Sequence, residues 1–196
     1  MKKLVPITLI VILILGLAWL LNSAQHDLLN KQSSAKRGGD FSLQSVNGPV
    51  SLSDFRGKVV LLYFGYTSCP DICPTNLALM ASAFGNMTPE QLNRVQGIFI
   101  SVDPKRDTVK RLDEYTNFFH KKIMGITGSE AEIAELASRY GVSYRFVEQK
   151  SDMLYVVDHS SETYVIDTQG EWVDTLPHAT QSEEIVKRIL PYISKD

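Results

Sequence analysis

The chain has 196 residues, of which 44% are hydrophobic and 21% charged, a composition that excludes collagen, coiled-coil arrays and intrinsic disorder. Its two cysteines are too few for a disulfide-dense scaffold or for a four-cysteine zinc or iron–sulfur site. The net charge of −2 divides unevenly, because residues 1–39 hold five basic residues against one acidic residue, and the acidic remainder has no basic stripe with which to bind nucleic acid.

The first predicted element is an N-terminal membrane segment. Two lysines precede an unbroken uncharged run, Leu4–Leu21, which as a helix would span about 27 Å, just enough to cross a bilayer. A cleavable signal peptide has a shorter apolar stretch that ends at small residues, whereas Asn22 and Ala24 make a poor cleavage pair. We therefore expect residues 1–21 to be an uncleaved N-terminal transmembrane helix, and a cleaved signal peptide is the alternative.

The charges beside this run predict its orientation. Lysines precede it, while the nine residues that follow offer only His26 and Asp27, so the positive-inside rule places the N-terminus in the cytoplasm. The chain has no amphipathic, Arg-rich and Ser-rich leader of the kind that directs proteins to organelles. We expect a single-pass protein of a bacterial inner membrane, with residues 22–39 as a polar tether and residues 40–196 as a domain facing the periplasm.

Strands and helices alternate through the first half of this domain. Val59–Phe64 and Gly97–Val102 are runs of β-branched and aromatic residues, which are typical of buried strands. Between them we predict a helix from Pro74, which suits the first helical position, to a stop at Gly85. Such alternation predicts an α/β fold whose sheet is covered by helices on both faces.

Two further helices follow the second strand. One is predicted to have its N-cap at Asp107 and to run to about His120. The other opens with a capping box of Ser129 and Glu132 and runs to Tyr140. Beyond it the pattern predicts four strands and a last helix: residues 143–147, 155–157, 163–166 and 172–173, then a helix capped by Thr180 with Glu183.

Both cysteines lie in the segment between the first strand and the first helix. In open α/β sheets, sites are built at this carboxyl edge of the strands. Cys69 and Cys73 each precede a proline, which disfavours helical backbone at the cysteine, so we predict a shaped loop in which both sulfurs face one point. The positive end of the following helix would favour thiolate over thiol. The alternative is that the two are small buried residues or a structural bridge.

The spacing of the pair argues against a general disulfide exchanger. Three residues separate the cysteines, one more than in the usual Cys-x-x-Cys redox motif. This spacing permits a disulfide between Cys69 and Cys73, and it also suits two thiolates that converge on one metal. No proline lies between Lys105 and Leu176, so the cis-proline that faces the cysteine pair in thioredoxins has no candidate here.

Three separated blocks of the sequence resemble the Sco/SenC family. The blocks, whose order and spacing match from Phe41 to the last helix, are Phe64–Pro74 (FGYTSCPDICP), Ser101–Thr108 (SVDPKRDT) and Val157–Ser160 (VDHS). The resemblance implies a thioredoxin-like fold with a mixed sheet, a membrane anchor, and a copper site of two cysteines and one histidine used in assembling cytochrome c oxidase. Carried over by position, the implied ligands are Cys69, Cys73 and His159.

The chemistry of these donors favours copper independently. Two thiolates and an imidazole suit Cu(I) in trigonal geometry and, with small rearrangement, Cu(II), whereas zinc normally takes a fourth ligand. We expect Asp158 to be the outer group that supports His159. The charged residues of the second block, which are Asp103, Lys105, Arg106 and Asp107, are interpreted as a turn and a helix cap, with docking of a partner as the alternative.

Three classes of function follow. A copper-binding protein that delivers copper to cytochrome c oxidase, or to another copper protein, needs Cys69, Cys73 and His159 together. A periplasmic thiol–disulfide oxidoreductase or redox sensor, which would maintain the thiols of the oxidase subunit, needs only the two cysteines. A peroxiredoxin-like peroxidase normally has Thr three residues before its reactive Cys, but Thr67 is two residues before Cys69, so this class is disfavoured.

Overall fold

The computed structural model describes residue 16, residues 37–151 and residues 154–193, and the chain divides after Lys36 into two units. Apart from residue 16, the predicted membrane segment lies outside the described residues, as does almost all of the predicted tether. Within the described part of the chain, no helix is long and apolar enough to cross a membrane. Gly38 and Gly39, which we assigned to the tether, belong to the second unit, where they hydrogen-bond with Arg139 and Tyr140.

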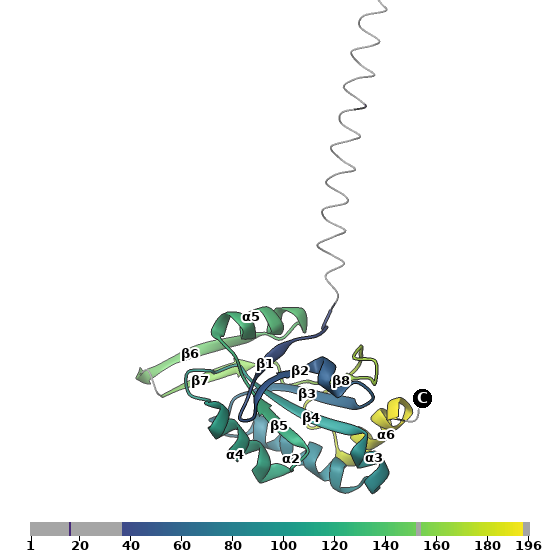
Figure 1. The fold of residues 1–196 in the computed structure, drawn as a ribbon. Coiled ribbons are helices and arrows are strands. Elements are labelled where there is room, and N and C mark those ends of the chain that lie inside the picture. Colours follow the sequence, from purple (N-terminus) through teal and green to yellow (C-terminus); the bar gives the residue numbers. More distant parts are fainter. Residues whose placement is uncertain (1–15, 17–36, 152–153, 194–196) are drawn as a thin grey trace, which may run out of the picture. The chain divides into compact units, whose positions relative to one another are not determined.

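A five-stranded mixed sheet forms the centre of the second unit (Figure 1). Strands β3, β4 and β5 are parallel, β8 runs antiparallel to β3, and β9 runs antiparallel to β8 and so in the same direction as β3. Strands β3 and β4 are buried along their whole length, which explains why both appear in the sequence as largely apolar runs. In spatial order the strands are β5 (Ile123–Ile126), β4 (Val95–Ser101), β3 (Val59–Gly65), β8 (Thr163–Ile166) and β9 (Trp172–Leu176).

Helices cover both faces of this sheet, as predicted (Figure 1). Tyr63 of β3 points toward α2, where its hydroxyl contacts Cys73, and the next residue, Phe64, points to the other face and packs against Tyr140 at the end of α5. The capping box predicted at Ser129 and Glu132 opens α5. The helices are α2 (Ile72–Gly85), α3 (Pro89–Asn93), α4 (Val109–Phe119), α5 (Glu130–Arg139) and α6 (Ser182–Ile193).

Two antiparallel hairpins lie outside the central sheet. One consists of β1 (Ser42–Ser45) and β2 (Gly48–Ser51) and leads into the 3-10 turn η1 (Leu52–Phe55). The other consists of β6 (Tyr144–Ser151) and β7 (Leu154–His159), paired so that Tyr144 lies opposite His159. Among the described strands, β6 and β7 pair only with each other, so this hairpin is not a continuation of the main sheet.

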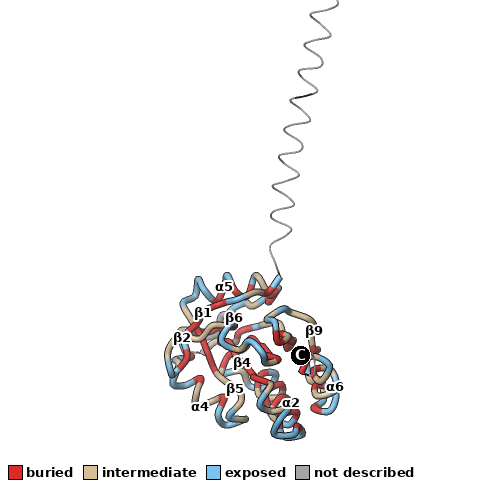
Figure 2. The backbone as a smooth tube through the Cα atoms, turned by 45° about the vertical axis from the view of Figure 1, so that its right-hand side comes forward, coloured by how far each residue is buried: buried red, intermediate tan, exposed pale blue. Residues whose placement is uncertain are grey.

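The hydrophobic core is centred on strands β3 and β4, where buried backbone runs through the middle of the unit (Figure 2). Leu61, Phe64, Ile98 and Phe99 are fully buried there. Burial of such a side chain contributes about 1.5–3 kcal/mol relative to leaving it exposed. The loop that carries the cysteines therefore leaves the sheet from one of its most firmly packed strands.

One predicted helix start was wrong by two residues. Helix α2 begins at Ile72, with Asp71 at the N-cap position, and not at Pro74. Proline is tolerated there because the N–H groups of the first helical turn have no intrahelical acceptor. As a consequence, Cys73 lies in the first turn of α2, and only Cys69 lies in the loop that we predicted for both.

Two predicted N-caps were also wrong. The N-cap of α4 is Thr108, whose hydroxyl accepts a hydrogen bond from the Arg111 N–H, and not Asp107. Helix α6 begins at Ser182, and Thr180 instead donates its hydroxyl to a backbone carbonyl three residues earlier. In both places a local pattern predicted the helix correctly but assigned the wrong residue to its end.

Candidate metal centre

The two cysteines meet at the junction of β3 and α2. Cys69 is partly exposed and Cys73 is buried, and both are free thiols. The backbone N–H of Cys73 points at the Cys69 sulfur from 3.4 Å. The first turn of α2 therefore presents both an N–H donor and the positive end of the helix dipole to Cys69, which favours its thiolate form.

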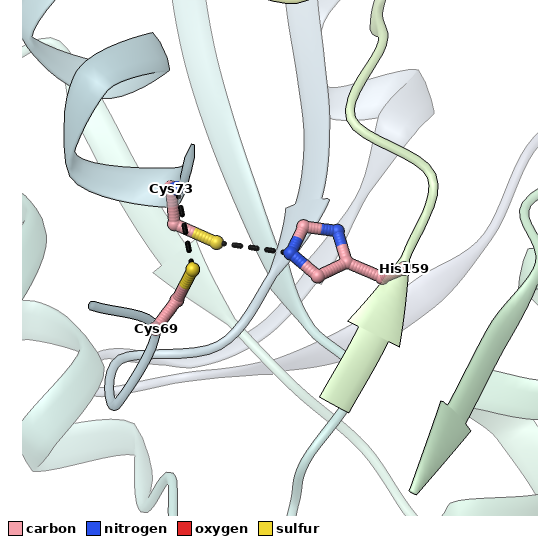
Figure 3. A group of neighbouring side chains, drawn as sticks. All are labelled: Cys69, Cys73 and His159. Atoms are coloured by element: carbon pink, nitrogen blue, oxygen red, sulfur yellow. Dashed lines mark hydrogen bonds between the residues drawn. The ribbon is translucent and has the colours of Figure 1, made fainter. Parts of the chain in front are cut away.

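His159 reaches the same point from the end of β7. Its Nε2 lies 3.2 Å from the Cys73 sulfur, and its Nδ1 lies 2.7 Å from the Ser160 carbonyl oxygen. Because a carbonyl only accepts hydrogen bonds, Nδ1 carries a proton, and Nε2 is the ring nitrogen that faces the sulfurs. The donor atoms of Cys69, Cys73 and His159 all lie within 4.8 Å of one another and could hold a metal ion (Figure 3).

The role that we predicted for Asp158 is taken by that backbone carbonyl. The Asp158 carboxylate pairs with Arg145 on the neighbouring strand, 2.9 Å away on the exposed side of the hairpin. Successive side chains of a strand point to opposite faces, so a residue directly before His159 is directed away from the ligand side.

The pKa values of the two thiols are shifted in opposite directions. The hydrogen bond from the Cys73 thiol lowers the pKa of Cys69 to about 3, assisted by His159 and by backbone N–H groups, although burial acts in the other direction. Burial raises the pKa of Cys73, and the negative charge of Cys69 raises it further. The metal-free site therefore holds one thiolate and one thiol, and a metal that bound both sulfurs would release the Cys73 proton.

This asymmetry predicts how the reduced, metal-free protein reacts with iodoacetamide. Cys69 is expected to react at a nearly constant rate between about pH 5 and about pH 8, because its thiolate is already formed above a pKa of about 3. Cys73 should stay unmodified over the same range. Timed labelling with peptide mass mapping measures both rates. A Cys69 rate that rises about tenfold with each pH unit would contradict the prediction, since that is the behaviour of an unperturbed thiol.

Gly65, which had no predicted role, shapes the position of the Cys73 sulfur. A Cβ atom on Gly65, the last residue of β3, would lie 2.7 Å from that sulfur and 2.8 Å from the Phe99 ring. Only a residue without a side chain lets the sulfur lie against the end of the strand. The sequence signal for this role was a glycine at the end of an apolar strand, directly before a cysteine loop.

We expect Gly65→Ala to displace the Cys73 sulfur. The added methyl group overpacks the site, so the free energy of unfolding should fall by about 1–3 kcal/mol. Affinity for a thiolate-binding metal should fall as well, because the two sulfurs no longer face one point. Gly85→Ala is the matched control, since a Cβ on Gly85 meets no atom within 4 Å. Urea unfolding and metal titration measure both effects, and equal behaviour of the two variants would refute the close-packing argument.

Buried polar residues fix the two segments that carry the ligands. The Asp107 carboxylate accepts hydrogen bonds from the Thr67 N–H at 2.9 Å, the Thr67 hydroxyl at 2.5 Å and the Ser101 hydroxyl at 2.6 Å, which anchors the cysteine loop to β4. The Asn76 amide of α2 donates to the Ser161 carbonyl at 2.8 Å, which anchors the chain just after His159. Asp107 was expected to be a helix cap, and Asn76 had no predicted role.

The sheet order, the helices on both faces and the cysteine pair after β3 define a thioredoxin-like α/β protein with a candidate centre of two cysteines and one histidine. The family model for SCO1/SenC matches residues 30–194, and the chain belongs to that family. The fold class and the family expected from the three sequence blocks are thus confirmed.

Curated relatives agree with this assignment. The chain is 41% identical over 144 residues to the SCO2-like protein RC0895 of Rickettsia conorii, covering 72% of this chain and 70% of that protein. It is 36% identical over 189 residues to the mitochondrial SCO2 homolog of Mus musculus, covering 92% of this chain and 74% of that protein.

Solved structures of relatives have the same fold. Arabidopsis thaliana ScoI with copper bound is 37% identical, with a TM-score of 0.72 over 80% of this chain and 98% of that one. Bradyrhizobium japonicum ScoI with copper bound is 35% identical, with a TM-score of 0.73 over 79% of this chain and 98% of that one. BsSco, described as having a disulfide switch and as a member of the Sco family of cytochrome c oxidase assembly proteins, is 25% identical with a TM-score of 0.63.

Proposed function

We propose that this protein binds one copper ion through Cys69, Cys73 and His159 and supplies it during the assembly of cytochrome c oxidase. The observation that carries the proposal is the convergence of two sulfurs and an imidazole nitrogen on one point. This donor set suits copper better than the harder cations, and three donors satisfy Cu(I) without a fourth. The copper-bound structures of ScoI relatives support the choice of metal.

The surroundings of the three donors suit delivery of the ion. Cys73 is buried, while Cys69 and His159 border a groove of about 300 Å³ between residues 69–72 and residues 156–159. A donor group of the acceptor protein can enter this groove and replace one ligand at a time. The ion would then pass directly from this protein to the acceptor without being released into water. The proposed acceptor is the copper-bearing subunit of the oxidase or another copper protein.

We also propose that residues 4–21 anchor the protein in a bacterial inner membrane with its domain in the periplasm. The uncharged run and the lysines before it support this placement. In an oxidising compartment the cysteine pair can be either reduced or disulfide-bonded, whereas a cytosolic pair would be held reduced. Protease added to intact spheroplasts should digest the domain, and protection from the protease would overturn the orientation.

A thiol–disulfide oxidoreductase is the second candidate, and one observation favours it. The low pKa of the partly exposed Cys69 beside the protonated, buried Cys73 is the arrangement of a nucleophilic thiol and its resolving partner. Such an enzyme would reduce the cysteines of an oxidase subunit and would need no histidine.

His159→Ala separates the two functions. The reduced wild-type protein should bind one copper per chain, and His159→Ala should bind it about 100-fold more weakly while its thiol exchange with a small disulfide continues. His178→Ala is the matched control, because His178 is exposed in a loop before α6. Copper-to-protein ratios, absorption spectra and exchange rates give the answer. If His159→Ala bound copper as tightly as the wild type, the proposed site would be wrong.

A further inference from the structure

The hairpin that carries His159 is held to the rest of the domain by a buried ion pair. Arg106 and Asp103, from the turn after β4, contact strand β7 with side chains that are only 7% and 1% exposed. Since β6 and β7 pair with no other described strand, side-chain contacts of this kind must locate the hairpin. We propose that Arg106, supported by Asp103, is a positioning residue that keeps His159 within reach of the two sulfurs; the inference rests on the proposed copper site.

The contacts converge on one residue of β7, Tyr155. The Arg106 Nη1 donates to the Tyr155 carbonyl at 2.8 Å, and its guanidinium group lies 3.6 Å over the centre of the Tyr155 ring. The Tyr155 hydroxyl donates to the Asp103 carboxylate at 2.6 Å, and the Arg106 Nε donates to the same carboxylate at 2.5 Å. Backbone, ring and hydroxyl of Tyr155 are therefore all held by the same ion pair.

This attachment is coupled directly to the ligand. Tyr155 and His159 are four residues apart in one strand, so their side chains share a face. The buried ring of Tyr66 lies between the ion pair and the ligand: the Arg106 guanidinium is 5.5 Å from its centre, and the His159 ring meets it edge-on at 5.8 Å. A shift of Arg106 would therefore move both the strand that carries His159 and the ring against which His159 packs.

The energetics of this ion pair indicate that it fixes geometry rather than adds stability. A buried ion pair loses most of its Coulombic gain to desolvation, and apolar replacements of similar volume are often equally stable. The Arg106 Nη2 atom is buried and has no hydrogen-bond partner among the described residues, which is a further cost. What the ion pair provides in return is a fixed direction for β7, because a guanidinium group binds in a planar, directional way.

Two variants test the proposal with little risk to the fold. Arg106→Lys keeps a buried positive charge beside Asp103 but cannot also hold the Tyr155 carbonyl and cover its ring. Tyr155→Phe removes only the hydroxyl that contacts Asp103. Lys105→Met and Tyr144→Phe are the matched controls. Lys105 lies in the same turn as Arg106, and its exposed charge pairs with Glu130 of α5, while Tyr144→Phe removes a hydroxyl from β6.

The first measurement needs no metal. In the full-length reduced protein, amide hydrogen exchange of residues 154–160 should become about tenfold faster in Arg106→Lys and Tyr155→Phe, with β3 unchanged. The controls should behave as the wild type does. If the hairpin kept its protection in both test variants, Arg106 would not hold it and the proposal would be overturned, whether or not the protein binds copper.

The second measurement connects the attachment to the ligand. Each test variant should lower copper affinity about tenfold when His159 is present and should have no effect in the His159→Ala background. The nitrogen splitting in the Cu(II) electron paramagnetic resonance spectrum should weaken while sulfur-to-copper absorption persists. An equal loss of affinity in both backgrounds would mean that Arg106 acts on the whole domain or on the cysteines, which would overturn the proposal. A wild-type protein that binds no copper would refute the proposed function, and the exchange measurement would then decide the positioning role.

Discussion

Copper binding is expected to disappear when Cys69 and Cys73 are both replaced by Ser. Serine hydroxyls stay protonated at neutral pH and are hard donors, so the site would keep one imidazole as its only ligand for a soft ion. The loss should be at least about a thousandfold in affinity, or about 4 kcal/mol. The buried position of Cys73 accepts Ser with little change of shape, and the nearby Tyr63 hydroxyl remains available to it.

Titration of the reduced protein with Cu(I), followed by copper-to-protein ratios after desalting, measures this loss. Ser82→Ala on the exposed face of α2 is the control, and circular dichroism shows whether each variant keeps its fold. Stoichiometric copper in the double variant would place the site elsewhere in the protein.

Oxidation of the same two residues is expected to exclude copper just as fully. Formation of the Cys69–Cys73 disulfide removes two protons and two electrons, which an added disulfide such as oxidised glutathione accepts through a mixed disulfide on Cys69. The sulfurs are already within 4.8 Å of each other, so bond formation requires only a small local displacement. Sulfur atoms in a disulfide are no longer thiolate donors, so two of the three ligands are lost.

Mass spectrometry of the intact protein detects the loss of two hydrogens, and copper titration of the oxidised and re-reduced samples gives both affinities. Re-reduction should restore binding completely, which distinguishes the disulfide from irreversible oxidation of the thiols. If the oxidised protein bound copper as tightly as the reduced one, the cysteines would not be the ligands.

The sequence predicted the parts of the site whose signals are local. Strand β3, the cysteine loop and α2 follow from an apolar run, a proline-rich turn and a helical pattern, and each of these was found close to its predicted place. Cys69, Cys73 and His159 were named together because three sequence blocks resembled a family, and the structure brings them together. The short elements β1, β2, β5 and α3 were missed, whereas β8, which is equally short, was predicted because the turn residues 167–170 follow it directly.

What sequence reasoning could not predict depends on contacts between distant segments. Asp103 and Arg106 have the same local pattern whether they form an exposed turn or a buried ion pair, and only the position of Tyr155 decides between the two. The separation of the β6–β7 hairpin from the central sheet is likewise a matter of pairing, which strand propensity does not reveal. Asp158 was expected to support His159 because it is adjacent in sequence, but alternation along β7 directs it to Arg145.

The separation of 86 positions along the chain from Cys73 to His159 has a consequence for synthesis of the protein. As the chain grows from its N-terminus, both cysteines emerge long before the histidine, and the hairpin with His159 forms only when most of the domain has been made. A nascent chain therefore exposes two thiols without the third donor, a state open to premature oxidation or to capture of a foreign metal. The complete copper site appears only with the finished tertiary structure, so loading it with the ion is a step that follows folding.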